Sequence, residues 1–235
     1  MTLARKCAAE AIGTAFLLAG VVGSGIMAER LAGGNMALAL LANTIATGGV
    51  LMCLIAALGP ISGAHFNPAV SIADAIRGGL KWSEVAVYAP SQLTGAVAGV
   101  AAANMMFGLP PLFASHHARG GPAQWFAEFV ATFGLLLVIW GCVRFKSTLV
   151  SFAVASYIVG AYWFTSSTSF ANPAVTVARA LSDTFAGIRP QDAPGFIGAQ
   201  LLGAVCATFL FQWLAPLTTG DAENVLLPHG DSNAA

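Results

Sequence analysis

Two asparagines, each at the start of an Asn-Pro-Ala phrase, have the clearest chemistry in this sequence. The phrases are Asn67-Pro68-Ala69 and Asn172-Pro173-Ala174. An asparagine side-chain oxygen caps a helix, and proline is favoured at the first helical position, so each phrase predicts a helix start. The amide hydrogens then stay free, and a water or hydroxyl oxygen between Asn67 and Asn172 accepts from both of them. Such an oxygen no longer easily accepts a hydrogen bond from a neighbouring water molecule, so protons could not pass along a row of hydrogen-bonded waters at this point. The positive ends of the two helices would also repel cations.

The composition places the chain in a membrane. Of the 235 residues, 57% are hydrophobic and 9% are charged, with a mean hydropathy of +0.76, whereas soluble domains carry about a quarter charged residues. Ten basic side chains balance ten acidic ones, so nothing indicates a nucleic-acid partner. We expect an integral membrane protein whose partner is the lipid bilayer, with no cofactor and no metal site.

Six apolar stretches are long enough to cross about 30 Å of hydrocarbon as helices. They are residues 7–28, 36–58, 84–107, 123–143, 148–165 and 194–216. Each Asn-Pro-Ala phrase opens a shorter helical run, over 67–77 and 172–182, which at about 1.5 Å per residue crosses half the membrane. Irregular backbone at this depth is tolerated only against protein or a water-filled cavity. The sequence thus predicts an all-α membrane protein with six transmembrane helices and two half-helices that meet at the midplane beside a pore.

The second half of the chain repeats the first. Ala9-Glu10 recurs as Ala127-Glu128, and Gln92-Leu93 recurs as Gln200-Leu201, in the same order around the Asn-Pro-Ala phrases. With three spans in each half, the second half enters the membrane upside down, which gives an inverted repeat and brings the two phrases face to face. We expect one channel domain over residues 1–220, with halves at about 5–107 and 123–216, and a polar tail over 221–235.

Lysine and arginine are slightly concentrated on one side of the predicted spans. Six lie on the side of both termini and four on the other: Arg5, Lys6, Arg77, Lys81, Arg144 and Lys146 against Arg30, Arg119, Arg179 and Arg189. Because basic residues favour the cytoplasmic side, both termini are predicted to be cytoplasmic.

These features together resemble the aquaporins, or major intrinsic proteins. The resemblance rests on the doubled Asn-Pro-Ala, the Ala-Glu pair in each half, the paired glutamines and the stretch Ser62-Gly63-Ala64-His65-Phe66, and it covers roughly residues 5–216. It implies a homotetramer, here in a bacterial inner membrane, in which every subunit has its own pore for water or small uncharged solutes. It also implies that the six residues of the two phrases lie at the pore midplane: Asn67, Pro68, Ala69, Asn172, Pro173 and Ala174.

Glu10 and Glu128 are carboxylates inside the membrane, where a functional role is the default expectation. One interpretation is a proton relay. The other, which the resemblance implies, is that each carboxylate accepts hydrogen bonds from the irregular backbone before a half-helix. We favour this anchoring role, because a relay needs the two acids to be linked and the repeat places them in opposite halves. Gln92 and Gln200 are likewise expected to be hydrogen-bond partners between helices.

His65 precedes the first phrase, and no second metal ligand follows it at helical spacing. We therefore expect it to pack in the cytoplasmic vestibule of the pore rather than to bind a metal. The backbone carbonyl oxygens of Gly63, Ala64 and Phe66 beside it would then be acceptors for permeating molecules.

The residue directly after the second phrase departs from the family pattern. Water-selective and glycerol-conducting aquaporins have an arginine there, which narrows the outer mouth, and this chain has Val175. The other family filter positions correspond to Ser169, Gly160 and about Thr47. A filter of Thr, Gly, Ser and Val has no guanidinium and no aromatic ring, so the resemblance implies a wider constriction with a weaker positive barrier. A valine here also resembles a bacterial subgroup associated with arsenic resistance, which passes arsenite and methylated arsenicals.

Arg179 lies four residues beyond Val175 on the same predicted half-helix, hence on the same face and about 6 Å nearer the outer side. It is a candidate for a displaced, looser outer mouth. The alternative, which we favour, is an arginine at the membrane interface that reaches lipid headgroups or pairs with Asp183.

The sequence therefore predicts a channel for facilitated diffusion of small, mainly uncharged solutes, which include water, glycerol-like polyols and arsenite with its methylated forms. A water-selective channel and a secondary transporter are the alternatives, because transporters also use inverted repeats and broken helices. An enzyme is not expected, since no Ser/His, Cys/His or paired-acid constellation has a plausible role.

Overall fold

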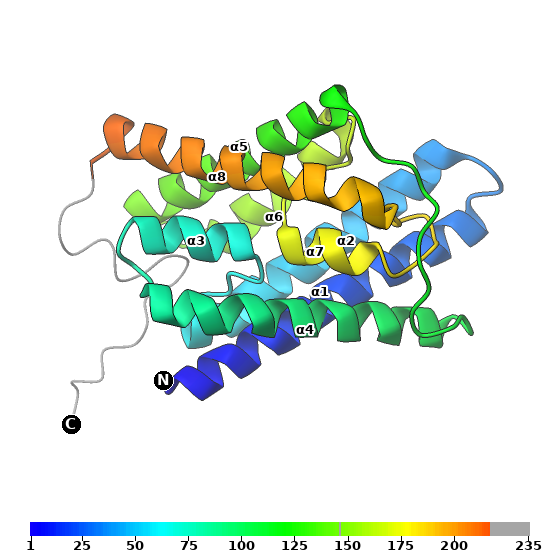
Figure 1. Cartoon of the computed structure of the whole chain (residues 1–235), viewed down its shortest axis with the longest axis horizontal. Coiled ribbons are helices and arrows are strands. Elements are labelled where there is room, and N and C mark those ends of the chain that lie inside the picture. Colours follow the sequence, from blue (N-terminus) through cyan, green and yellow to red (C-terminus); the bar gives the residue numbers. More distant parts are fainter. Residues whose placement is uncertain (146, 217–235) are drawn as a thin grey trace.

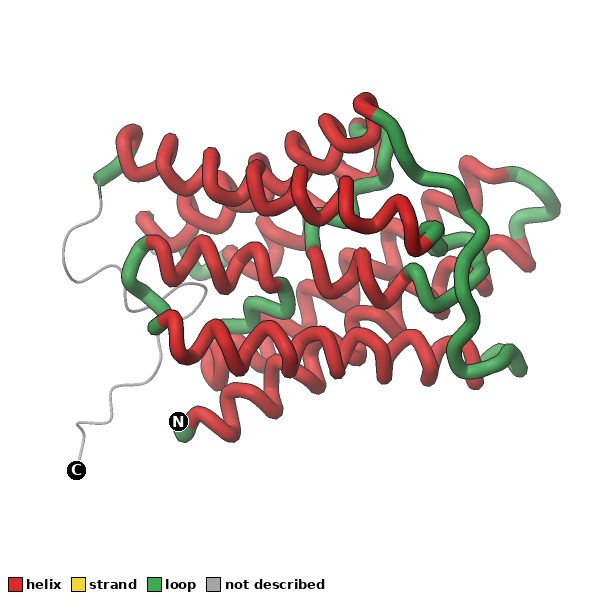
Figure 2. The backbone as a smooth tube through the Cα atoms, viewed as in Figure 1, coloured by secondary structure: helices red, strands yellow, loops and turns green. Residues whose placement is uncertain are grey.

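All regular structure in the described part of the chain is helical (Figures 1 and 2). The computed structural model describes residues 1–145 and 147–216, so Lys146 and the predicted tail over 221–235 lie outside it. The helices are α1 Leu3–Leu31, α2 Met36–Ser62, α3 Pro68–Ile76, α4 Trp82–Met106, α5 Pro122–Arg144, α6 Val150–Phe164, α7 Pro173–Arg179, the 3-10 turn η1 Pro190–Asp192, and α8 Ala193–Leu214. The predicted all-α fold of long helices and two half-helices is confirmed.

Five helices, namely α1, α2, α4, α5 and the η1–α8 segment, are long and apolar enough to cross a membrane. The predicted span at 148–165 is shorter than expected. Its helix, α6, has 15 residues, which at about 1.5 Å per residue gives a length of about 22 Å. The polar residues that follow Phe164 leave the helix, and irregular backbone over 165–171 continues the path toward Asn172.

The half-helices lie in the middle of the bundle. Figure 1 shows α3 and α7 one after the other between α4 and α8, and both half-helices contact both of these long helices. Asn67 and Asn172 are the N-caps, and a proline follows each at the first helical position, as expected from the preferences of these residue types. The predicted ends at residues 77 and 182 are slightly late, because α7 already ends at Arg179.

Small residues allow the long helices within each half to approach closely. A methyl group placed on Gly95 or Gly99 of α4 would overlap the backbone carbonyl oxygens of Ala11 and Ala15 of α1, respectively. On α8, Gly203 faces the Phe129 carbonyl of α5 in the same way. Such contacts supply van der Waals packing where lipid offers no hydrophobic driving force between helices.

Both ends of the described chain lie at one end of the bundle. The N-terminus and the last turn of α8 are on the left in Figure 1, and the connector over 107–121 runs along the opposite end. An even number of crossings requires this arrangement of the ends. The assignment of the N-terminal end to the cytoplasm stays a prediction.

Candidate channel and its constriction

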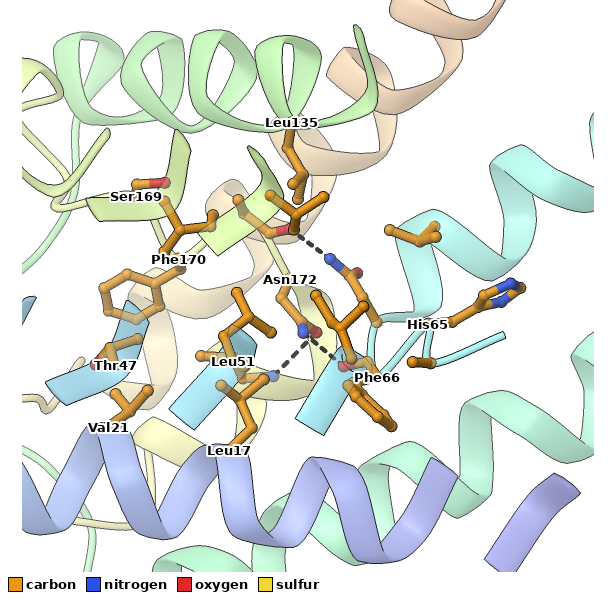
Figure 3. A pocket seen from close by; sticks show the side chains of 18 of the residues that line it. Leu17, Val21, Thr47, Leu51, His65, Phe66, Leu135, Ser169, Phe170 and Asn172 are labelled. Carbon is orange, nitrogen blue, oxygen red and sulfur yellow. Dashed lines mark hydrogen bonds between the residues drawn. The ribbon is translucent and has the colours of Figure 1, made fainter. Parts of the chain in front are cut away.

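One cavity runs through the centre of the bundle from His65 to Arg179. Figure 3 shows Asn172 near its middle, with His65 toward one end and Ser169 and Phe170 toward the other. Most of the wall is aliphatic: Leu17, Val21, Leu51, Ile55, Val70, Leu135, Ile139, Val154 and Ile158. The polar lining comes from the residues around the two Asn-Pro-Ala phrases, together with Thr47, Tyr162 and Arg179. The wall therefore combines aliphatic side chains with a smaller number of polar groups.

The two asparagines link the halves of the chain. Asn67 Nδ2 donates to the Ala171 carbonyl at 2.7 Å, and Asn172 Nδ2 donates to the Phe66 carbonyl at 2.7 Å. Their Oδ1 atoms accept from the helix starts, at 2.9 Å from Ala69 N and 3.0 Å from Ala174 N. The expectation that both amide hydrogens stay free is therefore wrong, because one hydrogen of each amide is used between the halves. Within the described residues, the second hydrogen of each amide donates to no protein group, and both asparagines line the cavity.

The backbone before each asparagine adopts a rare conformation. Ala64 and Phe66 have φ of 50° and 48°, and Ser169 and Ala171, at the matching positions of the second half, have 49° and 50°. Left-handed conformations cost energy for residues other than glycine and persist only where the surroundings impose them. The carbonyl oxygens of Ala64, Ser169 and Phe170 accept no hydrogen bond from the described part of the chain. They are available as acceptors for a permeating molecule.

Some predicted pore residues support the wall without lining it. Pro68, Ala69, Pro173 and Ala174 are not among the lining residues, because they form the first turns of α3 and α7 behind the asparagines. Gly63, which we predicted in the vestibule, is also not among the lining residues. It is the C-cap of α2 and has a left-handed conformation with φ 88°. Asn67, Asn172, Ala64, His65 and Phe66 do line the cavity.

Glu10 is fully buried and binds the loop before α3. Its carboxylate accepts from the backbone N–H groups of His65 at 3.0 Å and Phe66 at 2.6 Å, and from the Ser62 hydroxyl at 2.6 Å. Gln92 Nε2 donates to the same carboxylate at 2.8 Å and to Ser71 Oγ of α3 at 3.0 Å. The sequence predicted the partnership of Glu10 with this loop but not the role of Ser71.

Glu128 makes the same contacts in the second half. It accepts from the N–H groups of Phe170 and Ala171, both at 2.8 Å, and from Gln200 Nε2 at 2.6 Å. Gln200 also donates to Thr176 Oγ1 of α7 at 2.8 Å. Each carboxylate thus accepts hydrogen bonds from its own loop and from the glutamine of its own half, and the anchoring role stays a prediction.

His65 lies in the loop before α3 and packs against side chains of α3 and α4. Its Nδ1 lies 3.0 Å from Ser71 Oγ, its Nε2 lies 3.7 Å from Asp74 Oδ2, and its ring meets the edge of Tyr88 at 5.7 Å between centroids. Among the described residues no group of three His, Cys, Asp or Glu side chains is placed to hold a metal. His65 lines the end of the cavity that is predicted to be cytoplasmic.

Three of the four predicted filter residues line the cavity, and Figure 3 shows Thr47 and Ser169 toward the end opposite His65. Thr47, Ser169 and Val175 line the cavity, and their exposed fractions are 2%, 2% and 5%. Gly160 does not, because it faces outward from α6 and is exposed. The lining residues of α6 are Val154, Ile158 and Tyr162, at helical spacing, and two residues turn a helix by about 200°, which puts position 160 on the opposite face from Tyr162. The wall therefore contains an aromatic ring that the sequence argument left out.

Arg179 is inside the protein, contrary to the interpretation that we favoured from the sequence. It is 2% exposed and lines the cavity, its guanidinium lies 3.4 Å from the centroid of the Phe170 ring, and its Nε donates to the Ala186 carbonyl. Asp183, the expected partner, instead accepts from His116, at 2.8 Å from the backbone N–H and 2.9 Å from Nδ1. These two hydrogen bonds hold the pKa of the Asp183 carboxyl below its ordinary value.

Arg119, in the connector between the halves, is a second guanidinium beside Phe170 that the sequence did not reveal. It lies 5.4 Å from the ring centroid, and its donors reach the carbonyls of Gly187 at 2.7 Å and Phe185 at 3.3 Å. Its own sequence neighbourhood is polar and carries no motif, so only the path of the connector over the α7 end brings it here. Its hydrogen bonds join the connector to the segment that follows α7.

Comparison with known proteins agrees with this architecture. The model of the major intrinsic protein family matches residues 1–166. Aquaglyceroporin AqpS of Rhizobium meliloti (strain 1021) is 57% identical over 212 residues, 90% of this chain and 91% of that protein. Aquaporin NIP1-3 of Oryza sativa subsp. japonica is 34% identical over 218 residues, 89% of this chain and 73% of that protein.

A solved structure shares the fold. The X-ray structure of the aquaglyceroporin from Plasmodium falciparum aligns with a TM-score of 0.63 at 20% identity and covers 94% of this chain and 99% of that one. With half-helices, an inverted pair of Asn-Pro-Ala caps and a family match over most of its length, the chain belongs to the major intrinsic protein family, as a multi-pass membrane channel and not an enzyme.

Proposed function

We propose that this channel passes small, mainly uncharged polyhydroxyl solutes such as glycerol, together with water, through a constriction wider than that of a strict water pore. The observation that supports this most directly is the set of side chains at Thr47, Ser169 and Val175, which are all small and line the same cavity. None of them brings a guanidinium or an aromatic ring across the lumen. Tyr162 of α6 adds one aromatic ring to the cavity wall.

The mixed aliphatic and polar lining suits such solutes. A polyol has carbon-bound hydrogens on one edge and hydroxyl groups on the other, so the aliphatic wall can contact the first while carbonyls and the asparagine amides hydrogen-bond the second. A related aquaglyceroporin at 57% identity supports this solute class. Arsenite, a compact uncharged trihydroxyl molecule at neutral pH, belongs to the same class, and the methylated arsenicals, which are bulkier and partly anionic, are included among the expected solutes.

A stopped-flow panel on purified protein in liposomes tests the proposal. We expect glycerol, urea and arsenite to pass with a low activation energy and without saturation at modest concentration, alongside water. Water flux without solute flux would instead identify a water-selective channel. Saturation and a high activation energy would identify a secondary transporter.

We further propose that protons are excluded at the asparagine pair. Asn172→Asp keeps the oxygen that caps α7, removes the N–H donated to Phe66, and puts a negative charge on the cavity wall. Proton or cation flux should rise by about tenfold or more, because a unit charge within a few ångströms changes an ion's barrier by that much even at an effective dielectric constant near 20. The measurement is a pH-sensitive dye inside liposomes under an imposed potential. Intact glycerol flux with unchanged proton flux would rule out this role.

The assembly also belongs to the proposal. A homotetramer is expected from the family alone, with one pore in each copy of a single channel domain over residues 1–220 and with both termini in the cytoplasm of a bacterial cell. Chemical cross-linking in native membranes that stops at four copies would support it. Protease access to either terminus from outside intact spheroplasts would contradict the orientation.

A further inference from the structure

We infer that Arg179, one helical turn beyond Val175, is the charge-selective residue of this channel and does the work of the arginine missing at position 175. The inference rests on the proposed channel function and concerns which solutes the constriction rejects. It joins three observations within the described residues: a cavity-lining guanidinium, the absence of a salt bridge to it, and two hydroxyls without hydrogen-bond partners that line the same cavity.

The guanidinium of Arg179 is held without being neutralised. Stacking on Phe170 and the bond from Nε to the Ala186 carbonyl fix its position. Within the described residues, no carboxylate forms a salt bridge with it, and its two terminal amino groups donate to no other residue. Asp183 is bound to His116, and Glu128 is bound to its own loop and to Gln200. A full positive charge with free donors therefore faces the cavity.

The hydroxyls of Thr47 and Ser169 complete this stretch of wall. Both side chains are 2% exposed, both line the cavity, and neither hydroxyl oxygen has a hydrogen-bond partner in the described part of the chain. A buried hydroxyl without a partner costs free energy, so such groups are normally satisfied by protein or by a bound molecule. With the Arg179 amino groups they offer hydrogen bonds to a solute that presents oxygen atoms.

The position of the guanidinium explains how charge selection and width coexist. An arginine directly after the second Asn-Pro-Ala would start one turn nearer the midplane, about 6 Å away along the helix. Here the guanidinium lies flat against the Phe170 ring at 3.4 Å, which keeps its bulk on the wall. The charge repels cations over several ångströms, whereas steric exclusion acts only at contact. The channel is thus predicted to be wide for neutral solutes and closed to cations of the same size.

Urea and the guanidinium ion test this directly, because they share a planar shape and nearly the same size but differ by one charge. We expect wild-type protein in liposomes to pass urea and to exclude guanidinium. In Arg179→Gln the ratio of guanidinium to urea flux should rise by about tenfold or more, since a unit charge near the path is removed. Arg179→Lys, which retains the charge, should keep the ratio within about threefold of wild type.

Two further variants make the result specific. Arg189→Gln removes one charge from a loop residue that pairs with Asp192 and does not line the cavity, so it should leave the ratio unchanged. Arg179→Met is a second neutral variant that keeps the contact with Phe170, and retained urea flux reports that either variant is folded. An unchanged ratio in both neutral variants, or an equal rise in the lysine variant, would overturn the inference. Wild-type protein that passes neither urea nor glycerol would contradict the proposed function instead.

Discussion

Val175→Arg is expected to lower glycerol permeability by about tenfold or more, which corresponds to about 1.4 kcal/mol in the barrier. The valine side chain lines the cavity and is 5% exposed, so a longer side chain there is expected to extend into the lumen. The new guanidinium adds bulk and a hydrated charge at the same level as Thr47 and Ser169. Water is smaller than glycerol, so its permeability should fall less, by about threefold at most. Stopped-flow light scattering on matched proteoliposomes measures both.

Val175→Met separates bulk from charge, because methionine adds length without a guanidinium. We expect an intermediate loss of glycerol flux in this variant. Because positions 175 and 179 are both buried, the membrane level and the monodispersity of Val175→Arg are measured beside the flux, so that misfolding is not mistaken for a narrower constriction. If Val175→Arg reaches the membrane at the wild-type level and glycerol still passes at the wild-type rate, the argument for a wide constriction is wrong.

Glu128→Ala is expected to abolish the folded channel. The substitution leaves the N–H groups of Phe170 and Ala171 and the amide of Gln200 without the acceptor that they share. Each buried unpaired donor costs about 1–3 kcal/mol, so the three together approach the whole stability of a typical domain, about 5–15 kcal/mol. Thermal unfolding in detergent and the yield of monodisperse protein report the loss. Glu10→Ala should behave alike, because Glu10 holds the loop before α3 through corresponding bonds.

Glu128→Gln distinguishes anchoring from proton transfer. Glutamine retains one acceptor oxygen for the loop and cannot ionise, so we expect lower stability than wild type together with unaltered selectivity. A variant that folds normally but loses a proton flux measured in the wild-type protein would show that Glu128 is a relay and not an anchor.

The repeat explains how much of this site the sequence could predict. Each of the Asn67, Glu10 and Gln92 positions has a partner in the second half, and doubling turned weak local signals into a strong one. In the structure each glutamate accepts a hydrogen bond from the glutamine of its own half. The Nε2–Oε2 distance is 2.8 Å in the first half and 2.6 Å in the second. Short-range rules of capping were enough to predict the helix starts at Asn67 and Asn172.

The remaining features of the site depend on how each helix is rotated about its axis and on the paths of the long connectors. Sequence patterns determine neither of these. An error of two residues on α6 was enough to select Gly160 instead of Tyr162, because a helix turns about 100° per residue. Arg179 was assigned to the interface because charges are costly in a membrane, but Phe170 and the Ala186 carbonyl stabilise it inside. The path of the 107–121 connector, which brings Arg119 beside Phe170, follows from no local motif.

The cross-links between Asn67 and Ala171 and between Asn172 and Phe66 constrain how this pore can evolve. They join residues 104 and 106 positions apart, so each asparagine both holds the halves together and faces the permeating molecule. A change at either asparagine alters stability and permeation at once, and few substitutions satisfy both. The side chains of Thr47 and Val175 form no hydrogen bond within the described chain, so they do not carry both constraints. Solute range is therefore free to drift at the constriction while the midplane stays fixed.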